Sequence, residues 1–253
     1  MTENKLSNFL AALCFFLLTN SLFAQTATPT IQYIDASTET QDSVTMNAGD
    51  SQTAQAPLTI VCDAGLSLPE PWEATCEWRI SLTQQGSSTP LLTRYDASTS
   101  YTLTQSGSYE VKLYVTYHNP ESDATDECEY DAFTITISES ELTCPNAFSP
   151  NGDGKNDVLR VSCKSIVKLE AAIFNRWGKK MASKSVNGTN GGYTENGTYY
   201  IDLWDGRYGG DYVKDGAYFL NLEAKGSDGV NYKKKITINV IKGFNETSEH
   251  SDN

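Results

Sequence analysis

The sequence predicts an all-β fold, and three observations support this class. Fourteen Tyr, nine Phe and four Trp stand among many Thr, Val and Ser residues, a composition that favours strands. After residue 25 the long Ala, Glu, Lys and Leu runs typical of helices are missing. The chain has only two histidines, His118 and His250, so histidine-based acid–base or zinc chemistry has almost no material. We therefore expect a non-enzymatic β-protein without a cofactor.

The first 24 residues have the pattern of a secretory signal peptide. Lys5 precedes a short apolar stretch from Phe9 to Leu18, and small residues around Ala24 precede Gln25. A transmembrane anchor is the alternative, but Thr19-Asn20-Ser21 interrupts the stretch well below the ~20 residues that span a bilayer. We expect cleavage before Gln25 and no transmembrane anchor afterwards.

The charge of the chain changes abruptly near residue 142. Residues 25–142 carry 3 Lys and Arg against 18 Asp and Glu, whereas residues 143–253 carry 15 against 13. Such a shift predicts two separately built domains. The acidic half would repel phosphates, so nucleic acid is not an expected partner.

Residues 25–142 predict one sandwich of about seven short strands. Tyr109–Tyr117 and Phe133–Ile137 alternate apolar and polar side chains with period two. Further strands are expected at Pro57–Asp63, Leu91–Tyr95 and Thr75–Leu82, the last with Trp78 facing inward. Turn clusters separate these strands, as in an immunoglobulin-like (Ig-like) sandwich.

This half resembles the PKD-type and related Ig-like modules of bacterial surface proteins. The resemblance rests on Cys76-Glu-Trp78-Arg-Ile80 and on Ser106-Gly107-Ser-Tyr109-Glu-Val111. In the topology that it implies, Cys62, Cys76 and Cys128 gather at one end, and Cys76–Cys128 is the preferred disulfide with Cys62 unpaired. Cys144 and Cys163 are the remaining disulfide candidates of an exported chain with an odd number of mature cysteines.

Residues 143–243 predict a second antiparallel sandwich. Strands are expected at Leu169–Asn175, Tyr199–Trp204, Ala217–Glu223 and Tyr232–Ile241, with a glycine-rich loop between the first two. Residues 244–253 form a short polar tail.

Four motifs in this half carry a second resemblance. They are Pro145-Asn146-Ala-Phe148-Ser-Pro150-Asn151-Gly152-Asp153-Gly154-Lys-Asn-Asp157, Ile173-Phe-Asn-Arg-Trp177-Gly178, Trp204-Asp205-Gly206 and Asp215-Gly216-Ala-Tyr218. In this order they resemble the gliding-motility-associated C-terminal domain, also called the type B sorting domain of the type IX secretion system. The resemblance implies export to the cell surface or the medium, with the translocon and a dedicated outer-membrane protein as partners. The polar tail departs from the family pattern, in which the domain runs to the chain end.

The segment Asn151–Asp157 has two interpretations. Oxygen-bearing side chains at Asn151, Asp153 and Asp157 suit calcium, but Ser149 and Arg160 stand where an EF-hand needs acidic ligands. A turn in which Asn and Asp side chains bind the backbone accounts for the same residues, and we prefer it.

The aromatic residues of the second half also have two interpretations. Trp177 and Trp204 could stack on sugars, but beside glycines in a small sandwich we expect both in the core. The tyrosines around the glycine-rich region could form a recognition surface for the translocon or for glycans; they are Tyr193, Tyr199, Tyr200, Tyr208 and Tyr212. Lys233-Lys234-Lys235 is expected to protect a sheet edge, with an anionic partner as the alternative.

The function expected from the sequence is therefore that of an exported, non-enzymatic surface protein. The C-terminal domain would act as the sorting signal and the Ig-like domain as adhesive or spacer cargo, with other cells or surface glycans as further partners. The alternative is a carbohydrate-binding surface protein or an accessory module of a glycan hydrolase.

Overall fold

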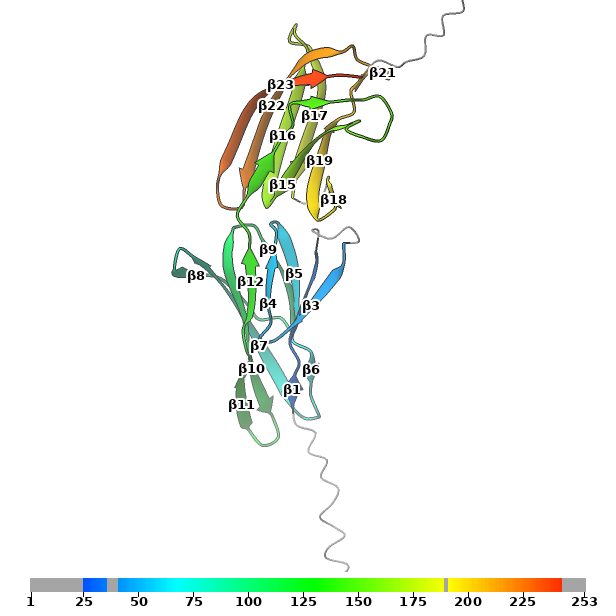
Figure 1. Ribbon diagram of the computed structural model, residues 1–253. Helices are drawn as coiled ribbons and strands as arrows, with labels where there is room; N and C mark the ends of the chain where they lie inside the picture. The colour runs from blue at the N-terminus through cyan, green and yellow to red at the C-terminus, as the bar shows by residue number, and fades with distance from the viewer. Residues whose placement is uncertain (1–24, 36–40, 189–190, 243–253) are drawn as a thin grey trace, which may run out of the picture.

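The computed structural model describes residues 25–35, 41–188 and 191–242 of the chain, and this part is all-β. Two sandwiches follow each other along the molecule (Figure 1). The predicted signal peptide and the polar tail lie outside the described residues. Within the described part, no helix has the length and apolar character needed to cross a membrane.

The larger sheet of the N-terminal domain is built around a long central strand, β10 (Gly107–Asn119). One edge of β10 pairs with β7 (Glu73–Gln84) and the other pairs first with β12 (Phe133–Ile137) and then with β11 (Ala124–Glu129). The sheet continues to β8 (Ser87–Arg94) on one side and to β4 (Ser51–Ala54) on the other. The predicted alternation is confirmed: Tyr109, Val111, Leu113, Val115 and Tyr117 are buried, and the residues between them are not.

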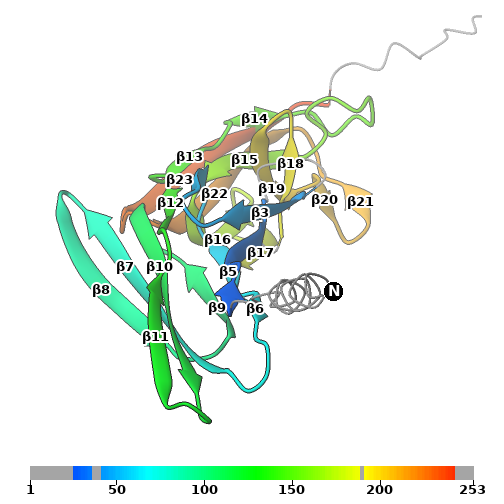
Figure 2. The same cartoon turned by 90° about the horizontal axis from the view of Figure 1, so that it is seen from below.

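The second sheet of this domain has the order β3-β2-β5-β9. Its strands are β2 (Thr30–Ile34), β3 (Ser43–Asn47), β5 (Leu58–Asp63) and β9 (Ser98–Leu103), while β1 (Thr26–Ala27) and β6 (Leu66–Ser67) form a separate pair. Viewed along the molecule, β7, β10 and β11 lie to one side of β5 and β9 (Figure 2). The two sheets enclose one apolar core that contains the fully buried Trp78, as predicted.

The C-terminal domain begins at β13 (Glu141–Thr143). Its first sheet has the order β13-β15-β19-β18, with β15 (Leu159–Lys164), β18 (Tyr193–Glu195) and β19 (Thr198–Trp204). Its second has the order β14-β23-β22-β16-β17. These strands are β14 (Ala147–Phe148), β16 (Ile166–Phe174), β17 (Lys180–Asn187), β22 (Gly216–Gly226) and β23 (Asn231–Val240), and β20 (Arg207–Tyr208) pairs with β21 (Asp211–Tyr212). A second core fills this sandwich.

Both sandwiches depart in one detail from purely antiparallel pairing. A short early strand of each domain runs parallel to its last strand, β4 beside β12 and β14 beside β23. All other strand pairs of the described chain are antiparallel. The expected fold class is confirmed.

The predicted disulfides are not formed. The described cysteines, Cys62, Cys76, Cys128, Cys144 and Cys163, all carry free thiols. Cys76 in β7 and Cys128 in β11 both pair with Val115, from opposite edges of β10. Adjacent strands are ~4.8 Å apart, so a whole strand separates two residues that a disulfide would need within ~7 Å. Because the sequence does not show that β10 lies between them, the preferred pair Cys76–Cys128 was wrong.

The two domains meet through backbone hydrogen bonds to loop serines. The buried backbone amide of Ala56 donates to the Ser165 hydroxyl at 3.2 Å, and the amide of Ser106 donates to the Ser227 carbonyl at 3.0 Å. The side chain of Val167 packs against the N-terminal core. The serine contacts come from loops at the facing ends of the two sandwiches, and Val167 lies at the start of β16.

The segment between the domains is held by the turn that joins β22 and β23. Asp228 accepts hydrogen bonds from the Ser140 amide at 3.0 Å and from the Ser140 hydroxyl at 2.7 Å. The Tyr232 hydroxyl donates to the Ser140 carbonyl at 2.8 Å. Burial raises the pKa of Asp228, but hydrogen bonds from Ser140 and Val230 outweigh it and hold the pKa below its ordinary value.

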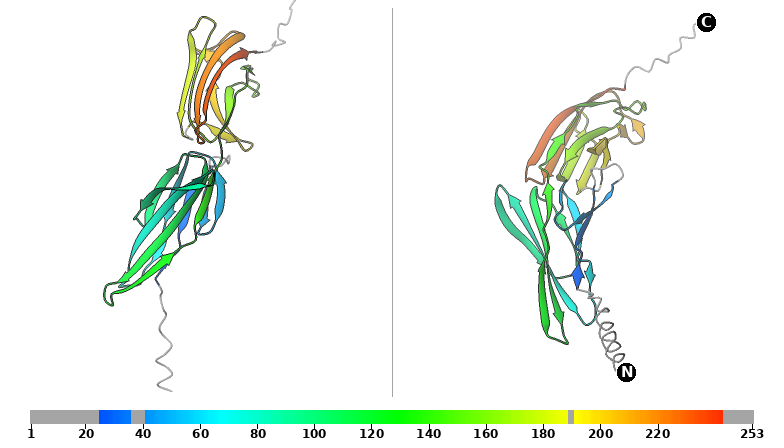
Figure 3. Two further views of the ribbon diagram at one scale, coloured as in Figure 1. Left: turned by 90° about the vertical axis from the view of Figure 1, so that its left-hand side faces the viewer. Right: turned by 60° about the horizontal axis from the view of Figure 1, so that its bottom comes forward.

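The result is an elongated molecule with two distinct ends (Figure 3). Strand β1 lies near the end of the N-terminal domain that points away from the joint, and β21 lies near the opposite end (Figure 1). We call the end of the C-terminal domain that contains Trp177, Trp204 and Gly216 the distal tip.

Candidate recognition surface at the distal tip

The sequence motifs of the C-terminal domain meet around three aromatic rings that pack against one another at the distal tip. Phe148 ends β14, Trp204 ends β19 and Tyr218 lies two residues into β22. The ring of Trp204 is 5.5 Å from Phe148 and 5.1 Å from Tyr218 between centroids, the latter edge-to-face. All three residues are buried. Trp204 is therefore a core residue, as predicted, and three distant motifs share one packing centre.

The turn that follows Trp204 depends on Asp205 and Gly206, the other two residues of its motif. The Asp205 carboxylate accepts a hydrogen bond from the Arg207 amide at 3.0 Å, and the indole Nε1–H of Trp204 donates to the Arg207 carbonyl at 2.9 Å. Gly206 has φ +76°, and a Cβ there would lie 2.7 Å from Cγ of Pro150. Only glycine fits this close approach to the neighbouring motif.

The Gly-x-Tyr motif forms a second support under the same rings. Gly216 has φ +141° at the start of β22, and the Tyr218 hydroxyl donates to the Lys214 carbonyl at 2.9 Å. This is the tyrosine-corner arrangement of Ig-like sandwiches.

The Pro-Asn motif ties the short strand β14 to β23, the last strand of the domain. The carbonyl of Asn146 accepts from the Asn239 amide at 2.8 Å, and that of Phe148 accepts from the Ile241 amide at 3.1 Å. Pro145 directly precedes this parallel pair, and Pro150 follows it.

The loop from Asn151 to Asp157 is a turn held by its own side chains. Asp157 accepts hydrogen bonds from the amides of Asn151, Gly152 and Gly154 at 2.7–2.9 Å. Asp153 accepts from the Lys155 amide and from the Asn151 side chain, and these hydrogen bonds lower its pKa. The predicted turn is confirmed, and the carboxylate oxygens of the calcium hypothesis are engaged by N–H groups. Among the described residues, no cluster of three or more His, Cys, Asp or Glu side chains could hold a metal ion.

Trp177 is not a core residue, so that prediction was wrong. It is 76% exposed in the turn between β16 and β17. The Asn175 side chain accepts hydrogen bonds from the amides of Trp177 and Lys179, both at 3.0 Å, and Gly178 has φ +78°. The motif therefore closes a tight hairpin turn, and the turn directs the indole into solvent.

Trp177 borders a groove of about 440 Å³ at the distal tip. Tyr208 and Tyr212, 43% and 44% exposed, line it from the β20–β21 hairpin. The groove is completed by residues of the β16–β17 hairpin, of β21, of the start of β22 and of the segment before it; they include Arg176, Met181, Asp211, Lys214, Asp215 and Ala217.

A cation stacks on each exposed ring of the groove. The guanidinium carbon of Arg176 is 4.4 Å from the centroid of Trp177, and that of Arg207 is 4.3 Å from Tyr212. The Lys179 ammonium is 4.4 Å from the centroid of Tyr208. Such pairs hold each ring and its cation together, and the Arg207 guanidinium also donates to the Tyr212 hydroxyl at 3.0 Å.

The predicted tyrosine surface divides into two parts. Tyr208 and Tyr212 belong to the groove, whereas Tyr193, Tyr199 and Tyr200 lie on β18 and β19. There the Tyr193 hydroxyl accepts from Arg160 at 2.8 Å, and its ring lies 6.1 Å from that of Tyr200. The sequence did not indicate the cations of the groove, because the turns that bring Arg176, Lys179 and Arg207 together are far apart along the chain.

The lysine run lies on β23, which pairs only with β22 over this stretch. Lys233 and Lys235 point outward, whereas the Lys234 ammonium donates to the Leu142 carbonyl at 3.0 Å. The position at an open edge fits the predicted protective role.

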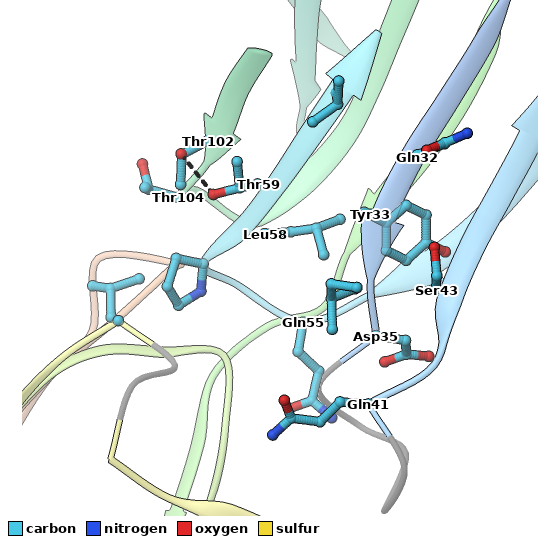
Figure 4. A pocket seen from close by; sticks show the side chains of 15 residues that line it. Gln32, Tyr33, Asp35, Gln41, Ser43, Gln55, Leu58, Thr59, Thr102 and Thr104 are labelled. Atoms are coloured by element: carbon cyan, nitrogen blue, oxygen red, sulfur yellow. Dashed lines mark hydrogen bonds between the residues drawn. The ribbon is translucent and has the colours of Figure 1, made fainter.

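The N-terminal domain has a larger hollow, of about 850 Å³, near the joint. Its wall is mixed: Leu58, Val61 and Val167 line it together with polar groups. The hydroxyls of Thr59 and Thr102 are 2.9 Å apart, and Gln55, Asp35 and Gln41 lie together on one side (Figure 4). The aromatic lining residue, Tyr33, is only 5% exposed. The described residues of this hollow therefore offer no open aromatic face to a sugar ring.

One family model matches the C-terminal part of the chain. Residues 142–240 match the family model of the CHU_C type IX secretion signal domain. No curated protein matches the chain.

Three solved structures that the chain matches share little sequence with it. A tetra-tandem repeat from the extending region of a large adhesion protein is 10% identical, with 87% of this chain and 68% of that one covered and a TM-score of 0.27. The SGBP-B protein of a Bacteroides ovatus mixed-linkage glucan utilization locus, in complex with a heptasaccharide, is 14% identical over 78% of this chain, with a TM-score of 0.23. Dimeric latent PorU from Porphyromonas gingivalis is 12% identical over 85%, with a TM-score of 0.27. The chain spans 44% and 20% of the latter two proteins, and at such TM-scores the likenesses carry no argument about function.

Proposed function

Because its C-terminal domain is a type IX secretion signal domain, which directs export across the outer membrane to the cell surface or the extracellular space, we propose that the chain is a non-enzymatic exported surface protein. The C-terminal domain serves as the sorting signal, and the N-terminal domain is adhesive or spacer cargo. The outer-membrane partner of the translocon binds the distal tip, where the exposed aromatic groove lies. The observation that carries this assignment is the meeting of the family motifs at that tip.

The difference between buried and exposed motif residues supports this role for the tip. Phe148, Trp204 and Tyr218 hold the core, so their presence is explained by packing alone. Trp177 has no such packing role, since three quarters of it faces solvent. An exposed cluster of large aromatic side chains on a soluble domain is typical of an interaction site.

The shape of the N-terminal domain supports a spacer role. Its sandwich adds length between the sorting domain and the start of the described chain (Figure 3). Its large acidic excess keeps such a module soluble and separate from its neighbours. His118, the histidine among the described residues, lies on β10 opposite Glu73 and Thr125, away from either groove.

The experiment that tests the proposal uses a fluorescent reporter fused to residues 141–253 behind the chain's own signal peptide. Export to the medium or the surface is measured in cells with and without a working type IX system. The wild-type fusion should leave the cell only when the system works. Release of the reporter without residues 141–253, or without the system, would show that the domain is not the signal.

A paired substitution separates recognition from folding. Trp177→Ala should leave the melting temperature nearly unchanged and reduce export, because the side chain faces solvent. Tyr193→Ala, an exposed tyrosine outside the groove, is the matched control and should be exported normally. Equal export of the two variants would place the recognition surface elsewhere on the domain.

A carbohydrate-binding role is the second candidate. The exposed rings of Trp177 and Tyr212 favour it, because such faces stack on sugars. Glycan-array binding by the purified protein that is lost in Trp177→Ala, together with normal export of that variant, would support this role over docking to the translocon.

A further inference from the structure

Strand β23 has one backbone edge that is largely open. It pairs with β22 along its length, whereas on its other side it pairs with β14 only near its C-terminal end. There the Asn239 and Ile241 amides donate to carbonyls of the β14 segment. Because successive residues of a strand direct their N–H and C=O groups to opposite edges, Lys233, Lys235 and Thr237 also direct theirs away from β22. Within the described part of the chain, no strand pairs with β23 at these three residues.

Strand β11 has a second open edge, in the N-terminal domain. Among the described residues it pairs only with β10. The amide of Tyr130, directly after β11, donates to the Leu113 carbonyl of β10 at 3.0 Å. By the same alternation, Thr125, Glu127 and Glu129 direct their N–H and C=O groups away from β10. All three residues are exposed.

The two edges carry opposite charges at the same spacing. The outward residues of β23 are two lysines and a threonine, and those of β11 are a threonine and two glutamates. An antiparallel alignment brings them opposite each other in three pairs: Thr125 with Thr237, Glu127 with Lys235, and Glu129 with Lys233. Residues paired in this way exchange two backbone hydrogen bonds and have their side chains on the same face. An edge whose lysines repel other basic strands is thus complementary to this acidic one.

The central pair of this alignment consists of two side chains without an ion pair in their own molecule. Glu127 and Lys235 are both exposed, and none of the ion pairs of the described chain involves either of them. The flanking charged residues each have one such pair, Glu129 with Lys112 and Lys233 with Glu223 at 4.0 Å. The central pair is therefore where a charge from a second molecule has the largest effect.

One molecule cannot join its own two edges. Strand β11 lies near the end of the N-terminal domain that points away from the joint, and β23 lies in the other sandwich (Figure 1). Residues 25–142 carry 3 Lys and Arg against 18 Asp and Glu, so two N-terminal domains repel each other. The strand of this protein that matches the β23 edge is therefore β11 of a second copy.

We propose that β11 of one molecule adds to the open edge of β23 in a second copy, in this antiparallel alignment. The contact is heterologous, because different surfaces of the two copies meet, and each molecule offers one edge of each kind. Copies thereby associate through the C-terminal domain of one and the acidic domain of the next. This self-association goes beyond the proposed function, and its test does not involve the secretion system.

The charge part of the contact is tested by sedimentation velocity of the purified protein over a concentration series. A reducing agent is present, so that the free Cys128 thiol of β11 does not cross-link copies. The wild type should associate as its concentration rises. Glu127→Lys and Lys235→Glu should each weaken this association by about tenfold or more, because each places like charges opposite one another.

A mixture of the two variants makes the test specific for the pair. In the mixture, the new lysine of one variant faces the new glutamate of the other, and the unchanged residues of the two variants also form a complementary pair. Association should therefore return to about the wild-type level, although each variant alone is impaired. Glu110→Lys on β10 and Lys225→Glu on β22 make the same charge changes at exposed positions away from the two edges, and both should associate normally.

The backbone part of the contact is tested by amide hydrogen exchange. The amides of Lys233, Lys235 and Thr237 should exchange rapidly in dilute protein and become protected where the protein associates. Thr237→Pro keeps both charged pairs and removes one outward N–H. Because this N–H does not face β22, the sheet tolerates the proline, and association should weaken.

Two results would overturn the proposal outright: a wild-type protein that stays monomeric at every concentration, or a mixture that associates no better than each variant alone. Association without protection of the three edge amides would show that the copies meet elsewhere. A monomeric protein whose edge amides are protected by a synthetic peptide of residues 123–130, and not by a scrambled peptide, would assign the edge to an acidic strand of another protein and contradict the role of a second copy.

Discussion

The hydroxyl group of Tyr218 donates a hydrogen bond to the backbone carbonyl of Lys214, four residues upstream, at 2.9 Å. Tyr109 makes the same contact with Gln105 in the N-terminal domain, at 3.0 Å. Each tyrosine follows a glycine of positive φ by two residues, Gly216 and Gly107. The two sandwiches differ in charge and in sequence, but they share this hydrogen-bonded tyrosine arrangement at the start of a long strand.

Removing this hydroxyl should destabilise one domain at a time. Tyr218→Phe deletes one hydrogen bond and keeps the ring, so a loss of about 0.5–1.5 kcal/mol is expected in the C-terminal domain. Tyr109→Phe should destabilise the N-terminal domain by at least as much, because the Tyr109 hydroxyl also accepts a hydrogen bond from the Gln105 amide at 3.2 Å. Thermal or denaturant unfolding with domain-specific probes measures both, and Tyr208→Phe, at an exposed ring, is the control that should change little.

Substitution of a buried ring at the distal tip should destabilise the domain strongly, whereas substitution of the exposed Trp177 should change its stability little. Trp204→Ala leaves a cavity between Phe148 and Tyr218 and should cost ~3–5 kcal/mol. Trp177→Ala should change the free energy of unfolding by no more than about 0.5 kcal/mol. Denaturant titration of the purified variants gives both values, and a large loss in Trp177→Ala would show that this indole packs against the domain.

Acid should weaken the segment between the domains. The pKa of Asp228 lies below its usual 3.8 in the folded protein, so the stabilisation from its hydrogen bonds is complete above that pH. It is lost as the pH falls through the folded-state pKa. Small-angle scattering should therefore report a less rigid molecule at acid pH. Asp228→Ala should show the same looseness at pH 7, and the exposed Asp123→Ala should not; unchanged scattering of Asp228→Ala would contradict the role given to this carboxylate.

The loop Asn151–Asp157 should depend on Asp157 and not on calcium. Asp157→Ala removes the acceptor of three backbone amides and should lower the melting temperature of the C-terminal domain. Addition of a chelator to the wild type should leave that temperature unchanged, because N–H groups already engage the carboxylates. A fall in melting temperature on chelation, restored by calcium, would instead support the metal site.

The rate at which each thiol is alkylated should fall as the burial of the cysteine increases. Burial raises the pKa of Cys62 and of Cys163 to about 12 and that of Cys144 to about 11. At pH 8 these thiols hold almost no thiolate, so their alkylation in the folded protein should be slow. Cys128 lies in β11 and is the least buried of the five described cysteines, so it should react first. Mass spectrometry after timed alkylation gives the order, and faster reaction of Cys62 than of Cys128 would show that the N-terminal core opens readily.

The long alternating strands could be predicted from the sequence because burial on one face fixes a period of two. Phe133–Ile137 matches β12 residue for residue, and Tyr109–Tyr117 lies within β10. Strands such as β17 and β9 were missed because they contain few apolar residues and are half exposed. Their position depends on the neighbouring strand and not on their own pattern.

The motifs of the candidate site could be predicted from the sequence, but which of their side chains are exposed could not. The glycines and the Asp-Gly pairs mark turns, and the packing of Trp204 beside them follows from their position. Trp177 stands in a similar motif, yet the Asn175 side chain bends the backbone so that the indole points outward. Nothing in the sequence distinguishes these two tryptophans, since the difference lies in which side of a hairpin turn each one occupies.

The end-to-end arrangement of the two sandwiches has a mechanical consequence. A protein complex that binds the distal tip meets the narrow end of the molecule. Force applied there acts along the long axis and passes through the serine contacts between the domains to the N-terminal sandwich. An aperture that admits the width of a single sandwich would then pass the whole body while it stays folded.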